Sequence, residues 1–176
     1  MNRVAVFGKP GSGKSTLSKK LSAATGIKLC SLDLIEYIKN GERVSHEEFS
    51  KKHANLISDD SWIIDGLGKL EFFWSRVDAA DTLIYVDLPY YVSYWWVTKR
   101  LLKSFIVKPE GWPEGSSVLK GTLAGWKYLR LSPRFWTPEL FEKIQSHGKD
   151  KDIYRITSIK EMNAFVKQHG DVDVSI

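Results

Sequence analysis

The chain has 176 residues, of which 43% are hydrophobic and 27% charged, and this predicts one soluble globular domain over residues 1–176. Its single cysteine, Cys30, excludes an intramolecular disulfide. The most apolar stretch, residues 83–97, is too short to span a membrane, and no signal-like segment precedes the first strand. We therefore expect a cytoplasmic protein.

Strands and helices are expected to alternate along the chain. Apolar runs predict strands at residues 3–8, 27–33, 61–66, 82–89 and 151–158, while helical periodicity predicts helices at 14–25, 45–57 and 158–166 and a further helix from about residue 90. Two helices begin at capping boxes, Ser45 with Glu48 and Ser158 with Glu161. This alternation is typical of βαβ units, so we expect an α/β fold with a mostly parallel sheet and helices on both faces.

The formal net charge of +5 is concentrated in one stretch. Between Lys99 and Arg134 there are eight Lys or Arg and two Glu, a net charge of +6. Within this stretch, residues 103–125 contain Pro109, Pro113 and several glycines and are expected to form a mobile insertion. A solvated face, a phosphate clamp and a nucleic-acid surface all remain open for this charge.

Residues 8–15 match the phosphate-loop pattern G-x-x-x-x-G-K-[ST]. Glycines in such a loop let backbone N–H groups turn toward phosphate oxygens, the lysine supplies a cation, and the serine hydroxyl ligates magnesium. The loop follows a strand and precedes a helix, as this mechanism requires. We expect bound ATP and Mg²⁺, with the nucleotide contacted by Gly8, Pro10, Gly11, Ser12, Gly13, Lys14, Ser15 and Thr16.

Three aspartates follow predicted strands: Asp33, Asp65 and Asp87. The carboxyl ends of parallel strands line the ligand crevice of such a sheet. Each aspartate on its own could cap a helix or a turn. Beside a phosphate loop, we expect Asp33 to face the phosphate acceptor as base or positioning group, Asp65 to support magnesium through water, and Asp87 to contribute to the metal site.

These motifs resemble the P-loop small-molecule and nucleoside-monophosphate kinases. "GKPGSGKST", "GERVSHEEF…WIIDG" and "YVDLP" followed by a helix ending in "TKR" are similar to adenylate kinases. "RVDAADTLIYVDLP" and "GWPE" are similar to the adenylate-kinase-related DNA topology modulation (FlaR-like) proteins. The resemblance implies a three-layer P-loop NTPase fold with strand order 2-3-1-4-5, a lid at about 103–125, a catalytic and phosphate-binding Arg100, and adenine near Thr157 and Ser158.

The chain also departs from the adenylate kinase pattern. Leu67, Gly68 and Lys69 replace the Phe-Pro-Arg that follows Asp-Gly in those enzymes, and only Arg43 and Lys39 are near enough in sequence to act as an acceptor clamp. We therefore expect an ATP-dependent phosphotransferase whose acceptor, a small molecule or a nucleotide, is not identified.

Two alternatives remain open: an ATP-binding regulator that contacts nucleic acid through the basic stretch, and a simple ATPase.

Trp112, in the expected lid, is a candidate for stacking on a base or closing over the site. No membrane partner is expected, and the oligomeric state is left open.

Overall fold

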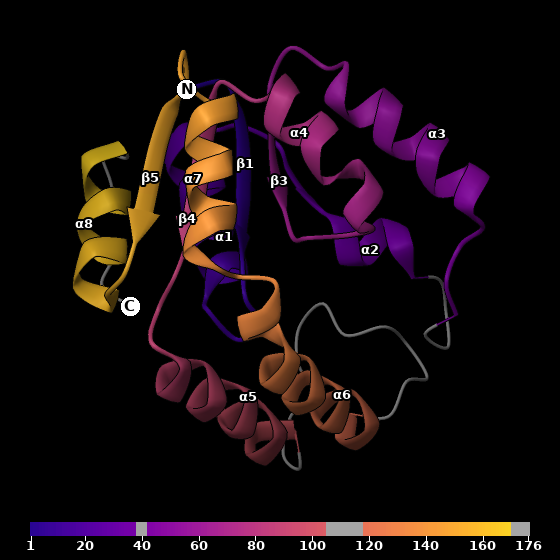
Figure 1. Cartoon of the computed structure of the whole chain (residues 1–176), viewed down its shortest axis with the longest axis vertical. Coiled ribbons are helices and arrows are strands. Elements are labelled where there is room, and N and C mark those ends of the chain that lie inside the picture. Colours follow the sequence, from indigo (N-terminus) through magenta and orange to yellow (C-terminus); the bar gives the residue numbers. More distant parts are fainter. Residues whose placement is uncertain (38–41, 105–117, 170–176) are drawn as a thin grey trace.

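The computed structural model describes residues 1–37, 42–104 and 118–169 and contains a five-stranded parallel sheet (Figure 1). The strands are β1 Arg3–Gly8, β2 Leu29–Ser31, β3 Trp62–Asp65, β4 Thr82–Val86 and β5 Asp152–Ile156. Their order, β2-β3-β1-β4-β5, is the one expected. Strand β1 pairs with β3 and β4, with Val6 opposite Asp65 and Ile84, so the phosphate loop begins at the centre of the sheet.

Helices cover both faces of the sheet, as expected. They are α1 Lys14–Thr25, α2 Leu32–Glu36, α3 His46–Ile57, α4 Phe73–Ala79, α5 Tyr90–Ser104, α6 Val118–Leu131, α7 Pro138–His147 and α8 Ile159–His169, with 3-10 turns at Leu70–Phe72 and Ser132–Arg134. Side chains alternate along β1: Val4 and Val6 pack with α1 and α8, whereas Ala5 and Phe7 pack with α2, α3, α4 and α7. The two cores therefore lie on opposite sides of one sheet.

Several boundaries differ from the sequence expectation. Strand β2 ends at Ser31, so Asp33 lies in the first turn of the short helix α2 and not at a strand end. Residues 118–125, expected in the mobile insertion, belong to helix α6. Each predicted capping box forms its serine half, since Ser45 Oγ accepts the Glu48 N–H and Ser158 Oγ accepts the Glu161 N–H, both at 3.1 Å.

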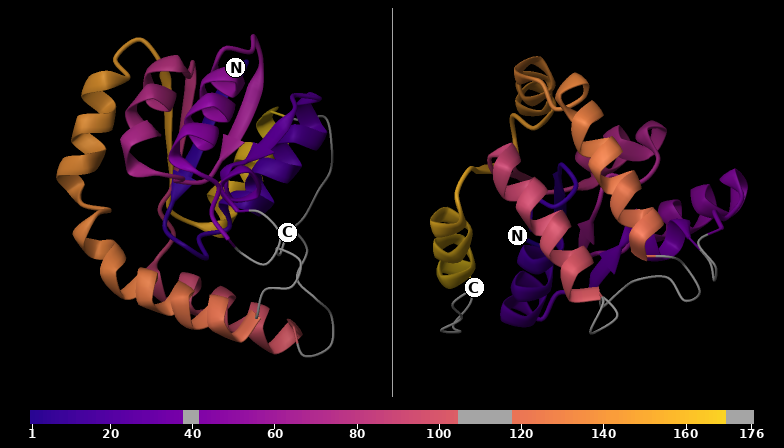
Figure 2. Two further views of the ribbon diagram at one scale, coloured as in Figure 1. Left: turned by 90° about the vertical axis from the view of Figure 1, so that its right-hand side faces the viewer. Right: turned by 90° about the horizontal axis from the view of Figure 1, so that it is seen from below.

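Helices α5 and α6 lie beyond the carboxyl ends of the strands and pack against each other (Figures 1 and 2). A Cβ on Gly125 of α6 would meet Val97 of α5 at 3.4 Å, an ordinary van der Waals distance, so the two helices approach closely here. None of the helices in the described ranges has the length and apolar character needed to cross a membrane.

Candidate phosphoryl-transfer site

The phosphate loop connects the end of β1 at Gly8 to the start of α1 at Lys14. Gly13 is the N-cap residue of α1, with φ +83°, and no side chain caps this helix end. Ser12 is fully buried, and its hydroxyl has no hydrogen-bond partner among the described residues. Uncapped N–H groups at a helix start and an unpaired buried hydroxyl fit an anion, so the loop is suited to nucleotide phosphates.

Helix α5 packs directly on this loop. A Cβ on Gly11, where φ is +68°, would lie 2.7 Å from both the Ser93 carbonyl oxygen and Val97 Cγ2. A Cβ on Gly13 would overlap the Trp96 ring. Glycine is therefore required at these positions both by the backbone conformation and by the closeness of α5.

Asp65, at the end of β3, lies next to the start of α1. Its side chain is buried and accepts a hydrogen bond from the Ser15 hydroxyl. Burial raises the pKa of the Asp65 carboxyl, nearby Lys14 and the Ser15 hydrogen bond lower it, and the charge on Asp33 raises it further. One carboxylate oxygen, Oδ1, has no partner within the described residues, and this leaves an oxygen suited to a magnesium ion or its bound water.

Asp33 and Lys14 complete this group. A Cβ on Gly66, the residue after Asp65, would lie 3.9 Å from Asp33 Oδ1. Lys14 Nζ donates a 3.3 Å hydrogen bond to the Lys9 carbonyl oxygen, within the loop itself. The structure thus brings Lys14, Ser15, Asp33 and Asp65 close together. Across the described ranges, no three His, Cys, Asp or Glu side chains gather in a way that could hold a metal ion without other ligands.

A second charged group, which sequence analysis did not assemble, extends from Asp33. Glu36 is 6% exposed, and burial raises the pKa of its carboxyl, with Arg43 opposing the shift. Arg43 Nε lies 3.4 Å from Glu36 Oε1, and the guanidinium also donates two hydrogen bonds to the Tyr37 hydroxyl. Lys69 Nζ lies 5.2 Å from the centre of the Phe49 ring. The charges of Arg43, Asp33 and Lys69 all act on the Glu36 carboxyl, so these groups lie near one another.

The loop after Asp65 is held by a buried arginine that sequence analysis also missed. Arg76 is 2% exposed and donates hydrogen bonds to the Leu67 carbonyl oxygen and toward His53 Nε2. Burial lowers the pKa of Arg76 to about 10 and that of His53 to about 4, so His53 is neutral near pH 7 and able to accept this hydrogen bond. Arg76 therefore fixes the turn that follows Asp65.

Asp87 interacts with a different set of residues from Lys14, Ser15, Asp33 and Asp65. Its carboxylate oxygens are bound by two cations: Oδ1 lies 2.7 Å from Lys9 Nζ, and Oδ2 lies 2.7 Å from Arg155 Nη2. Burial alone would raise the pKa of Asp87, but the hydrogen bonds from Lys9 and Arg155 outweigh it and lower the pKa. Both carboxylate oxygens of Asp87 are thus paired with cations of the protein, and the expected role of Asp87 as a metal ligand stays a prediction.

The remaining predicted residues in the described ranges are Arg100 on α5 and Thr157 and Ser158 directly before α8. Arg100 is exposed and follows Trp96 and Val97 by four and three residues, so it extends the loop-facing side of α5 by one turn. Thr157 donates its N–H and hydroxyl to the Glu161 carboxylate, and Ser158 caps α8. Trp112 and Lys39 lie outside the described residues.

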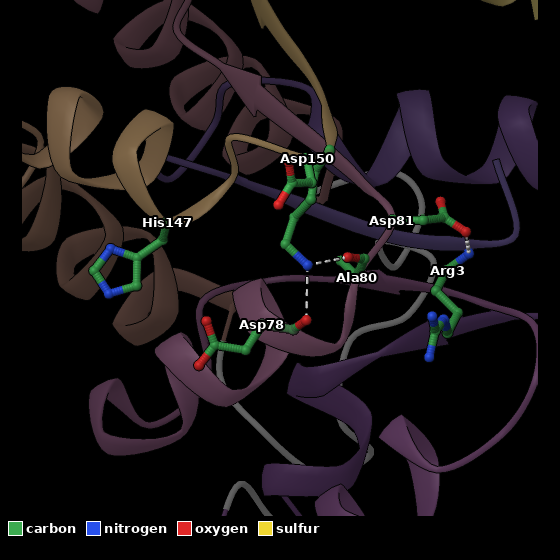
Figure 3. Close-up of a pocket in the computed structure, with 7 residues that line it drawn as sticks. Arg3, Asp78, Ala80, Asp81, His147 and Asp150 are labelled. Carbon is green, nitrogen blue, oxygen red and sulfur yellow. Dashed lines mark hydrogen bonds between the residues drawn. The ribbon is translucent and has the colours of Figure 1, made fainter.

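One cavity, of about 400 Å³, lies at the opposite edge of the sheet (Figure 3). It is lined by Arg3, Asp78, Ala80, Asp81, His147, Asp150 and Lys151, which flank the amino ends of β1, β4 and β5. Two of its charged side chains form hydrogen bonds with the backbone. The Asp81 carboxylate accepts the N–H groups of residues 2 and 3, and Lys151 Nζ donates to the carbonyl oxygens of residues 78 and 80. Ligands of parallel α/β sheets bind at the carboxyl ends, so this cavity is not the candidate site.

The sequence and the structure were compared with those of known proteins, and a kinase of known structure shares this fold. No protein-family model matches the sequence. Over 85 residues the chain is 33% identical to a protein of Methanocaldococcus jannaschii described as "Putative adenylate kinase"; the match covers 48% of this chain and spans only 42% of that relative. A shikimate kinase from Acinetobacter baumannii, solved with shikimate, aligns with TM-score 0.56 over 96% of this chain and 90% of that chain at 13% identity.

A sugar kinase from Janibacter sp. HTCC2649 aligns over 78% of this chain and 99% of that chain at 17% identity, with a TM-score of 0.41. The sheet order and the match to shikimate kinase define the class: the chain has the fold of P-loop kinases.

Proposed function

We propose that the protein is an ATP-dependent phosphotransferase that transfers the γ-phosphoryl group of ATP to a small acceptor. The observation that carries this proposal is the grouping of Lys14, Ser15, Asp33 and Asp65 at the carboxyl edge of the sheet, beside a helix start without a side-chain cap. Phosphoryl transfer depends mainly on positioning and on charges that stabilise the transition state, and this group offers both.

The loop binds the nucleotide phosphates, and Lys14 provides the cation that meets the transferred group. Ser15 and Asp65 would hold magnesium, which when bound would neutralise charge on the phosphate oxygens. The unpartnered Oδ1 of Asp65 supports this role, because a buried carboxylate oxygen without a donor gains a partner from the hydrated ion. Asp33 faces the acceptor and accepts its proton or orients its hydroxyl. Arg100, on the loop-facing side of α5, adds a cation to the phosphates.

The acceptor that we propose carries a hydroxyl group and no phosphate. A nucleoside monophosphate needs arginines or lysines that are free to bind its phosphate. Among the described residues of the acceptor side, Arg43 is paired with Glu36 and Tyr37, Lys69 lies against the Phe49 ring, and two carboxylates, Asp33 and Glu36, lie close by. Carboxylates are acceptors for the hydroxyl groups of polyols, so this side favours such a molecule over a phosphate dianion.

The test begins with Lys14→Ala and with a control on an exposed lysine of α3, Lys51→Ala. MgATP binding is measured by titration calorimetry, and ATP use is followed in the presence of polyols, sugar acids, nucleosides and AMP. We expect Lys14→Ala to lose turnover by on the order of a hundredfold or more with its fold intact, and Lys51→Ala to match the wild type. Unchanged turnover in folded Lys14→Ala would contradict the phosphate-loop assignment.

A second candidate function is supported by the surface of the α5–α6 pair. Tyr91 and Trp95 are 75% and 59% exposed on α5, the exposed cation Lys99 follows Trp95 one turn later on the same face, and Tyr128 is 56% exposed on α6. Exposed aromatic rings among cations suit single-stranded nucleic acid. Under this alternative, DNA affinity falls steeply with added salt, and ATP use does not respond to any acceptor.

The same panel separates the simple ATPase from the kinase, because an ATPase consumes ATP equally with and without acceptor. The narrower likeness to DNA topology modulation proteins also stays a prediction. Measuring the DNA affinity of the protein at increasing salt concentrations tests whether this chain binds DNA.

A further inference from the structure

The phosphate loop contains a lysine that points away from the phosphate site. Lys9, the second residue of the loop, is 3% exposed, and its ammonium lies 2.7 Å from Asp87 Oδ1 at the end of β4. The same ammonium lies 4.4 Å from the centre of the Tyr90 ring. A buried ammonium with a carboxylate and an aromatic face as partners is held in one place, since leaving either partner would expose an unpaired charge in a poorly solvated site.

Asp87 is itself fixed from the neighbouring strand. Its Oδ2 accepts two hydrogen bonds from Arg155 of β5, at 3.1 Å from Nε and 2.7 Å from Nη2, and its backbone N–H donates to the Ile156 carbonyl at 2.8 Å. The Arg155 guanidinium lies over the Phe141 ring, 5.0 Å from its centre. The carboxylate that holds Lys9 is thus anchored by both backbone and side chain to the edge of the sheet.

The backbone of Lys9 links this anchor to the phosphate site. The Lys9 carbonyl oxygen accepts hydrogen bonds from the Ser12 N–H and from Lys14 Nζ, each at 3.3 Å. The loop enters this region from Gly8, where a Cβ would overlap the Val86 carbonyl of β4. The side chain of Lys9 is therefore held by β4 and β5, while its carbonyl orients the turn and the lysine that meet the phosphates.

We propose that Lys9 and Asp87, supported by Arg155, are positioning residues that lock the phosphate loop to the ends of β4 and β5 and so set Lys14 for nucleotide binding. The role in catalysis rests on the proposed function, but the effect on nucleotide affinity does not need an acceptor. Asp87 acts here on the loop through Lys9 and not on magnesium.

The experiment measures MgATP affinity by titration calorimetry in the wild type and in Lys9→Met, Asp87→Asn and the double variant Lys9→Met/Asp87→Leu. The control is Lys52→Met, which breaks a 2.7 Å ion pair with Glu48 on the exposed surface of α3. Each protein is also titrated with magnesium at fixed ATP, and its unfolding midpoint in urea is recorded. The double variant replaces the buried pair by apolar side chains, so it keeps the test valid if a single variant does not fold.

We expect Lys9→Met and Asp87→Asn to weaken MgATP binding by about tenfold, with the magnesium concentration for half-maximal binding unchanged. The double variant should recover the wild-type unfolding midpoint without recovering affinity, because it restores packing but not the tether. Lys52→Met should bind as the wild type does.

Wild-type affinity in folded Lys9→Met or in the double variant would overturn the proposal. A raised magnesium requirement in Asp87→Asn alone would overturn it in favour of a metal ligand. Failure of the proposed function looks different: the wild type would bind MgATP and show the same dependence on Lys9, yet no acceptor would take the phosphate. A folded wild type without MgATP affinity would remove both proposals.

Discussion

Gly11→Ala tests the contact between the phosphate loop and α5, and Gly26→Ala is its matched control. The two glycines have nearly the same backbone conformation, with φ +68° and +72°. A side chain costs about 1 kcal/mol in that conformation at either position. They differ in their surroundings: a Cβ on Gly26 meets nothing within 4 Å, whereas one on Gly11 lies 2.7 Å from the Ser93 carbonyl oxygen. We therefore expect Gly11→Ala to cost about 1–3 kcal/mol more than the control.

The free energy of unfolding of both variants is measured by urea denaturation, and MgATP affinity by calorimetry. Gly11→Ala should lose affinity as well as stability, because the loop or α5 must shift to admit the methyl group. Gly26→Ala should lose only about 1 kcal/mol of stability and bind MgATP normally, since Gly26 ends α1 at the far side from the loop. Equal destabilisation of the two variants would refute the packing of α5 on the loop.

The centre of the sheet was predictable because β1, β3 and β4 are short continuous apolar runs buried on both faces. The elements that escaped prediction have weaker local signals. Helix α4 is only seven residues long and carries the buried Arg76, which breaks its apolar pattern. In α6, Gly125 lowers the intrinsic helix propensity. Helix α7 does carry a signal, a Thr137 N-cap followed by Pro138, that pattern analysis could have used.

In the candidate site too, residues that belong to a local motif were predictable from the sequence, whereas pairings between residues far apart in the sequence were not. Lys14 and Ser15 follow from a motif of consecutive residues, and Asp65 follows from its place at a strand end. The pairing of Lys9 with Asp87 could not be read from the sequence, because the two residues lie 78 positions apart. Asp87 was correctly placed at the edge of the sheet, but its surroundings, two cations from β5 and the loop, depend on three-dimensional packing that one sequence does not reveal.

Three further predictions concern charge. Asp33→Asn should reduce phosphoryl transfer more than MgATP affinity, whereas Asp65→Asn should raise the magnesium concentration needed for half-maximal binding; identical titrations of both variants would mean that their roles are wrongly divided. Arg100→Ala should reduce transfer with little change in the unfolding midpoint, and a change only in DNA affinity would favour the nucleic-acid alternative. His53 gives a pH effect: its pKa is about 4 when folded and about 6.5 when unfolded. Between these two pH values His53 is protonated in the unfolded chain but not in the folded one. The free energy of unfolding therefore falls as the pH drops from about 6.5 to about 4, by on the order of 2 kcal/mol after solvent screening. Urea unfolding at pH 7 and pH 4.5 should show a smaller loss in His53→Gln than in the wild type, and equal losses would contradict a buried neutral histidine that accepts from Arg76.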